Sequence, residues 1–126
     1  MPHEDGDAYH PCVGTVSLGG SVVLDIYPKS ADGSIPRVPR WRILKEPRSL
    51  LVTTGDAYVL TLHGIADVAI DEHLRAETVA NWDLLGDRTV FERQGGRNER
   101  VTRTSLTFRD VLKVSNAGAR ILGVRK

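Results

Sequence analysis

Three side chains of the kinds that bind metal ions stand out in this chain: the imidazoles of His3 and His63 and the carboxylate of Asp5. An extended backbone turns alternate side chains to opposite faces, so His3 and Asp5 would share one face while Glu4 points away. Two imidazoles and one carboxylate are the ligands of a facial iron site, which leaves coordination positions open for substrate and dioxygen. These residue types and their spacing predict an iron site.

Two arginines further along the chain could serve such a site. Arg103 and Arg109 have the spacing that places them on one strand face, together with Ser105 and Thr107. Guanidinium groups are costly to bury on the inner wall of a β-barrel unless anions meet them. One interpretation is an internal ion pair, for example between Arg109 and Asp5. The other interpretation keeps this pair and adds a dicarboxylate co-substrate bound by the arginines.

Each of these signals also has a structural explanation. A His-x-Asp pair is common by chance, and a histidine at the end of a strand, as expected for His63, is more often a hydrogen-bonded core residue than a metal ligand. Gly64 follows it and leaves room beside the imidazole. The iron site is favoured because the His-x-Asp pair, the distant histidine and the two arginines occur in this order along one chain.

The elements that must position these residues are predicted to be short strands separated by Gly- and Pro-rich turns. We expect one antiparallel hairpin from residues 12–18 and 21–27, and a second strand pair from residues 49–53 and 57–63. The proline-containing stretch 28–40 is predicted to be a surface loop. Together these elements would bring the His-x-Asp segment and His63 onto a common sheet framework.

The second half of the chain is less regular. Residues 66–87 have a loose apolar spacing that would suit a short amphipathic helix, and residues 88–100 are predicted to be a polar loop. Strands are expected at residues 102–108 and 119–124. Short antiparallel strands joined by such turns favour an all-β sandwich or jelly roll.

Composition bounds the class of protein. The chain has 126 residues, of which 40% are hydrophobic and 26% charged, values typical of one globular domain. No apolar run approaches the ~20 residues that span a bilayer, and the acidic N-terminus does not resemble a signal peptide. The single cysteine, Cys12, excludes an internal disulfide, fits a reducing compartment and is expected to be buried in a strand. We therefore expect a cytoplasmic or nuclear protein without a membrane segment.

Charge is unevenly distributed along the chain. Residues 1–87 carry 13 acidic and 7 basic side chains, whereas residues 88–126 carry 3 acidic and 10 basic side chains. A basic third could contact a polyanion such as nucleic acid. A solvated polar loop explains the same residues equally well, so charge alone does not decide between these two interpretations.

Five short motifs carry a family resemblance. They are HEDGDAYHP at 3–11, TVSLG at 15–19, EPRSLLV at 46–52, LHGI at 62–65 and RTSLTFR at 103–109. Together they resemble the AlkB family, and within it the branch of the sixth homologue. The resemblance covers most of the chain, with residues 66–100 the least similar part. It implies a double-stranded β-helix, the jelly roll of dioxygenases that use Fe(II), 2-oxoglutarate and O2.

The resemblance also implies roles for the site residues. By motif position, His3, Asp5 and His63 would be the iron ligands and catalytic residues. Hydroxylation of a substrate C–H bond would release succinate and carbon dioxide. On an N-methyl group, typically of a methylated nucleic acid, it would lead to demethylation with loss of formaldehyde.

The motif that contains the two arginines would bind the co-substrate. Arg103, assisted by Ser105, would hold the distal carboxylate of 2-oxoglutarate. Arg109 would steady Asp5 and the proximal carboxylate.

One element of the family has no counterpart here. Its Asn-x-Tyr motif, which binds 2-oxoglutarate, lies upstream of His-x-Asp, so residues 1–126 would be the C-terminal portion of a single dioxygenase domain, an N-terminally truncated jelly roll. Two alternatives to an active enzyme follow. The chain could be an inactive or regulatory fragment that binds metal without turnover, or a non-enzymatic jelly-roll interaction module.

Overall fold

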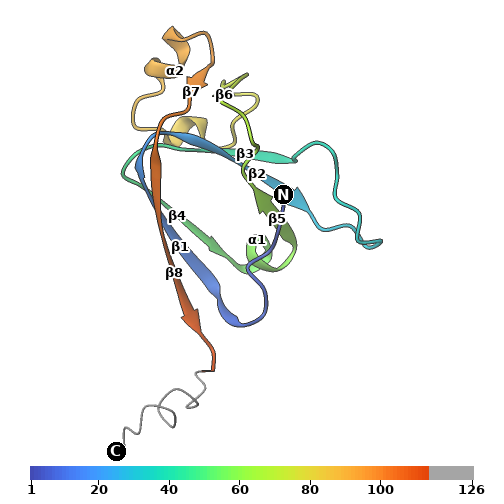
Figure 1. Cartoon of the computed structure of the whole chain (residues 1–126). Helices are drawn as coiled ribbons and strands as arrows, with labels where there is room; N and C mark the ends of the chain where they lie inside the picture. The colour runs from blue at the N-terminus through green and yellow to red at the C-terminus, as the bar shows by residue number, and fades with distance from the viewer. Residues whose placement is uncertain (114–126) are drawn as a thin grey trace, which may run out of the picture.

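The computed structural model describes residues 1–113 and consists mainly of antiparallel strands (Figure 1). In chain order the elements are β1 (Tyr9–Gly19), β2 (Val22–Pro28), β3 (Trp41–Lys45), β4 (Ser49–Thr54), α1 (Gly55–Val59), β5 (Thr61–Gly64), β6 (Ile70–Asp71), the 3-10 helix η1 (Trp82–Leu84), α2 (Thr89–Arg93), β7 (Asn98–Glu99) and β8 (Arg103–Val111). The all-β prediction is confirmed. The strand expected at 119–124 lies outside the described residues.

The strands form two three-stranded sheets and one small ribbon. One sheet has the order β4-β1-β8, the other β3-β2-β5, and β6 pairs with β7. All of these pairings are antiparallel. The two larger sheets form two layers (Figure 1), an arrangement consistent with a jelly roll.

The hairpin expected from residues 12–18 and 21–27 is wrong, because β1 and β2 lie in different sheets. Gly19 and Gly20 form the corner between the sheets, where the backbone of Val101 and Thr102 passes very close. A Cβ on Gly19 would lie 2.6 Å from the Thr102 carbonyl oxygen, and one on Gly20 would lie 2.7 Å from Val101 Cγ2. The two glycines therefore allow a close crossing of chain segments, which a hairpin turn would not require.

The second expected strand pair is also wrong. Residues 49–53 do form a strand, β4, but residues 57–63 divide between the helix α1 and the strand β5 of the other sheet. Strand β3 was not predicted, although it follows directly after the loop at 28–40. Among the described residues, no helix is both long enough and apolar enough to cross a membrane.

Cys12 is exposed, contrary to the prediction that it is buried. It lies in β1 at the point where the pairing with β8 is interrupted, because the register shifts between Tyr9 and Val13. Val13, the next residue, is buried and lines the cavity between the sheets, so strand alternation places Cys12 on the outer face of β1.

The segment 66–100 folds over the outer face of the sheet β3-β2-β5 rather than as a helix followed by an open loop. It contains β6, η1, α2 and β7, so the predicted amphipathic helix at 66–87 is absent from the structure and a helix occurs within the predicted loop 88–100. The hydrophobic core joins two strand residues to four residues of this segment: Val23, Leu44, Leu74, Val79, Trp82 and Phe91. The main apolar core thus lies outside the two-sheet sandwich.

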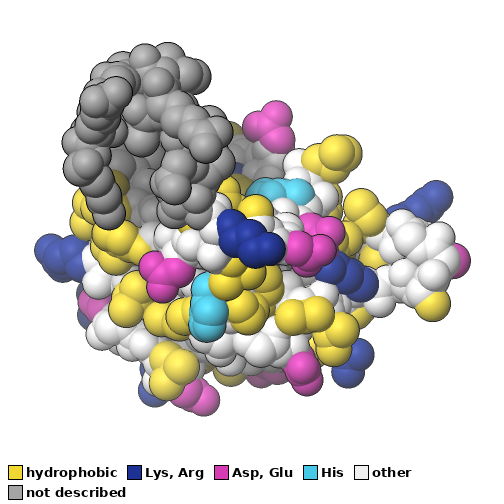
Figure 2. Space-filling view, turned by 90° about the horizontal axis from the view of Figure 1, so that it is seen from below, with side chains coloured by type: hydrophobic (Ala, Val, Ile, Leu, Met, Phe, Trp, Pro, Cys, Tyr) yellow, Lys and Arg dark blue, Asp and Glu magenta, His cyan; other side chains and the backbone are white. Residues whose placement is uncertain are grey.

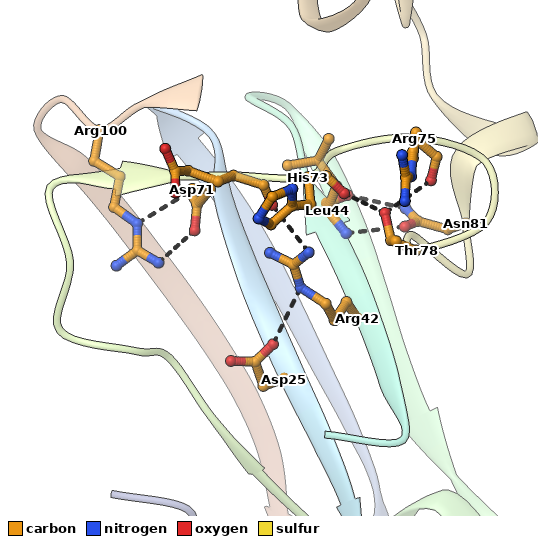
Figure 3. A network of polar contacts seen from close by, with 10 residues as sticks. Asp25, Arg42, Leu44, Asp71, His73, Arg75, Thr78, Asn81 and Arg100 are labelled. Carbon is orange, nitrogen blue, oxygen red and sulfur yellow. Dashed lines mark hydrogen bonds and ion pairs between the residues drawn. The ribbon is translucent and has the colours of Figure 1, made fainter. Parts of the chain in front are cut away.

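Polar contacts fasten this segment to the edge strand β3 (Figure 3). The backbone N–H of Leu44 donates to Asn81 Oδ1 at 2.9 Å, and Asn81 Nδ2 donates to the Leu44 carbonyl oxygen at 2.9 Å. Arg42 Nη1 donates to the carbonyl oxygen of Glu72 at 3.0 Å. The Asn81 amide therefore satisfies edge groups that a neighbouring strand would otherwise pair.

Candidate metal and co-substrate site

The inner faces of the two sheets enclose a cavity of about 770 Å³. All six residues proposed from the sequence line it: His3, Asp5, His63, Arg103, Ser105 and Arg109. The period of two along a strand explains this for β8, because residues 103, 105, 107 and 109 all face inward. Viewed from below, the molecule shows histidine, acidic and basic side chains set among hydrophobic ones (Figure 2).

His3 is held beside His63 by an antiparallel bridge of the backbone. The His3 N–H donates to the His63 carbonyl oxygen at 2.9 Å, and the His63 N–H donates to the His3 carbonyl oxygen at 2.8 Å. Their ring centroids are 4.6 Å apart. The space that Gly64 leaves is used by Pro2, whose Cα would lie 3.2 Å from a Cβ at position 64. Glycine here lets the first residues approach β5.

Asp5 is paired with Arg109, as both interpretations of the sequence predicted. Arg109 Nη2 donates to Asp5 Oδ1, and the Asp5 side chain is only 7% exposed. The guanidinium carbon of Arg109 also lies 5.3 Å from the centre of the Tyr9 ring. This end of the cavity thus combines a carboxylate with its own counter-ion, a favourable arrangement for a carboxylate away from water.

The three predicted metal ligands share the cavity but do not form a closed metal site. In residues 1–113 no group of three or more His, Cys, Asp or Glu side chains is placed to hold a metal ion. The two imidazoles lie together, whereas the carboxylate is engaged by Arg109. Burial lowers the pKa of His63, although the Asp5 carboxylate acts in the opposite direction. Burial therefore favours the neutral imidazole, the form that binds metals.

Arg103 differs from Arg109 because it has no acidic partner among the described residues. Its Nη2 donates to Ser17 Oγ at 3.0 Å and to Ser105 Oγ at 3.2 Å, while its Nε is buried without any hydrogen-bond partner. Burial also lowers the pKa of this guanidinium. A half-buried cation that faces a cavity without an acidic partner is suited to binding an anion.

Two residues of this region were missed by sequence reasoning. Ser17 is fully buried and lies opposite Ser105 in the β1–β8 register. Lys45 is only 5% exposed and lines the cavity from β3. The signal that could have revealed Lys45 is the alternation of Trp41, Ile43 and Lys45, which places all three on one face once a strand is assigned there.

Comparison with known proteins identifies the family. No protein-family model matches the chain. A curated relative from Danio rerio, described as "Probable RNA/DNA demethylase ALKBH6", is 37% identical over 123 residues, which is 93% of this chain and 50% of the relative. The chain therefore spans about half the length of the curated relative it matches. With this identity extending over nearly all of its residues, the chain belongs to the AlkB family.

Proposed function

We propose that this chain provides the Fe(II) and 2-oxoglutarate site of an AlkB-type dioxygenase that demethylates nucleic acid. The observation that carries the proposal is the shared cavity: two imidazoles and a carboxylate line it together with an unpaired guanidinium. The name of the relative, an RNA/DNA demethylase, supports nucleic acid as the substrate class. A cytoplasmic or nuclear location is part of the same proposal.

The donor chemistry fits a ferrous ion. His3, His63 and Asp5 would hold it, because imidazole nitrogen and carboxylate oxygen are the ligands of non-haem iron oxygenases. Arg109 contacts only Oδ1 of Asp5, so Oδ2 remains as a donor for the metal. Fe(II) bound there, with 2-oxoglutarate and dioxygen, would supply the oxidation of a substrate C–H bond, with succinate and carbon dioxide as by-products and formaldehyde released from an N-methyl group.

The residues of β8 would position the co-substrate and the iron ligand. Arg103 lines the cavity without an acidic partner among the described residues, and Ser105 already orients its guanidinium. Arg109 would hold the Asp5 carboxylate in one orientation, because a guanidinium pairs with carboxylates in a fixed geometry. Arg103 would thus bind the distal carboxylate, while Arg109 would support the metal end.

An anaerobic titration tests the proposal. Purified protein receives Fe(II) and then 2-oxoglutarate, and the visible metal-to-ligand charge-transfer band is recorded. We expect a saturable band that is lost in Asp5→Ala and kept in Asp110→Ala, a matched variant of an exposed aspartate. A folded protein without any band would contradict the proposal and favour the non-enzymatic interaction module. A band without succinate formation on methylated oligonucleotides would favour metal binding without turnover.

Two further variants separate the ligand roles. His63→Ala should abolish Fe(II) binding, because it removes one imidazole of the pair. Arg103→Ala should leave Fe(II) bound and weaken 2-oxoglutarate, because Arg103 would contact only the distal carboxylate. Equal loss of both ligands in Arg103→Ala would show that this arginine is structural.

A further inference from the structure

Lys45 is a buried cation of the cavity for which none of the motifs provides a role. It is the last residue of β3, and its side chain points inward with Trp41 and Ile43. Lysine is rarely buried without a partner, because an ammonium group loses its hydration there. Within residues 1–113 no aspartate or glutamate forms an ion pair with Lys45.

Two acidic residues near Lys45 in the sheet or in the sequence interact with other groups. Asp25 lies on the opposite face of its sheet, where its Oδ1 is 3.7 Å from Arg42 Nε (Figure 3). Glu46, the next residue after Lys45, accepts hydrogen bonds from the backbone N–H groups of Gly86 and Asp87 at 2.8 and 3.3 Å. Neither acid is therefore positioned as a permanent counter-ion for the ammonium group.

Lys45 and Arg103 line the same cavity from different sheets. Burial, and then the charge of Arg103, lower the pKa of Lys45 to about 8. Arg103 itself has a buried Nε without a partner. Two like charges that line one cavity disfavour each other, so an anion bound between them would relieve both.

We propose that Lys45 is a co-substrate-binding residue that, together with Arg103, holds the terminal carboxylate of a dicarboxylate. The inference rests on the proposed function for the identity of that dicarboxylate, 2-oxoglutarate. Arg103 supplies a planar donor whose orientation is set by Ser17 and Ser105, and Lys45 supplies a point charge from the facing sheet.

The pair would also set specificity. A 2-oxo acid without a terminal carboxylate would leave both cations without an anion, so the pocket should discriminate against it. We therefore expect a strong preference for 2-oxoglutarate over 2-oxobutyrate, and we expect Lys45 to account for part of it.

The test compares Lys45→Met with Lys113→Met, a control on an exposed lysine of the described chain. Methionine keeps the length of the side chain and removes its charge. Calorimetric titrations use 2-oxoglutarate on the Fe(II)-loaded protein, and glutarate, which has no keto oxygen to chelate a metal, on the metal-free protein. We expect Lys45→Met to bind each dicarboxylate about tenfold or more weakly than wild type. Binding of 2-oxobutyrate should change little, and Lys113→Met should match wild type.

The outcomes separate this inference from the proposed function. Equal affinity of wild type and Lys45→Met for both dicarboxylates would overturn the role of Lys45 while leaving the iron site intact. Weaker glutarate binding by Lys45→Met, in a protein that never gives the charge-transfer band, would support Lys45 although the dioxygenase proposal fails. Absence of binding of either dicarboxylate to folded wild type would overturn both. Thermal unfolding of Lys45→Met at or above the wild-type temperature would exclude misfolding as the cause of weaker binding.

Discussion

The two faces of the sheet β3-β2-β5 are used in opposite ways. On the outer face, Val23 and Leu44 pack into the hydrophobic core with the segment 66–100. On the inner face, Leu24 and Ile43, each one residue away along its strand, line the cavity. A packed face contributes stability, whereas a hollow face leaves room for ligands. The difference shows that the same two strands both anchor the fold and form one wall of the candidate site.

Charged groups show the same contrast. On the outer side Asp71 is nearly fully buried, but Arg100 Nε donates to it at 3.0 Å (Figure 3). Asn98 Nδ2 also donates to it, at 2.9 Å. In the cavity, Arg103 and Lys45 have no such acidic partner among the described residues. Buried groups with paired charges favour a single fold, whereas unpaired buried cations are typical of binding sites.

The largest expected effect comes from the packed side. Phe91→Ala should lower the free energy of unfolding by about 3–5 kcal/mol, because it removes a buried ring of the core. Urea denaturation measures this change. Phe108→Ala on the outer face of β8 is the matched control, because Phe108 is 61% exposed and its loss should cost less than about 1 kcal/mol. Similar losses in the two variants would contradict the location of the core.

Removing one partner of the buried ion pair between Asp71 and Arg100 should lower the free energy of unfolding by somewhat less than Phe91→Ala does. Asp71→Ala removes the carboxylate to which both Arg100 and Asn98 donate, and we expect a loss of about 3 kcal/mol in unfolding free energy. The double variant Asp71→Ala with Arg100→Met removes both charges and should recover part of that loss. If the double variant were less stable than Asp71→Ala alone, an unpaired Arg100 charge would not be the cause of the lost stability.

A substitution of a cavity residue should raise the free energy of unfolding rather than lower it. Lys45→Met removes an unpaired buried charge, so the free energy of unfolding without ligand should rise by roughly 1–2 kcal/mol. Chemical denaturation of the ligand-free protein measures this gain, with Lys113→Met expected to stay within about 0.5 kcal/mol of wild type. A clear loss of stability in Lys45→Met would mean that the ammonium group has a stabilising partner.

The smallest expected effect is the dependence of stability on pH that Lys45 causes. Because the pKa of Lys45 is lowered to about 8 in the folded protein, the unfolded chain binds more protons between that pH and the ordinary lysine pKa of about 10.4. Stability should therefore rise with pH in this interval, by about 1 kcal/mol between pH 8 and pH 9. The contribution of Lys45 is measured as the difference between wild type and Lys45→Met in the free energy of unfolding at each pH. If this difference did not change with pH, the lowered pKa of Lys45 would be contradicted.

The parts of the fold that the sequence predicted are those with a clear local signal. Alternation identified β8 and its inward-facing Arg103 and Arg109, and the spacing of His3 and Asp5 placed both side chains toward one cavity. Motif order then brought the more distant His63 to the same place. That these three residues bind iron stays a prediction.

The predictions that were wrong concern features that depend on contacts between segments distant in the sequence. A Gly-Gly pair is equally compatible with a hairpin and with a corner, and only the approach of Val101 to Gly20 decides for the corner. The segment 66–100 has few regular elements, because its apolar residues are spaced to cover a sheet rather than to form one face of a helix. Lys45 was missed because β3 is short and follows a long loop.

The bridge between His3 and His63 has a thermodynamic consequence. Two hydrogen bonds hold residues that are far apart in the chain, and β5 has no other strand partner on that edge in the described structure. Local opening of such a bridge costs far less than global unfolding, so its amide hydrogens should exchange early. A ligand that binds only the closed form would slow exchange at both amides by the same factor, which makes them a built-in reporter of occupancy.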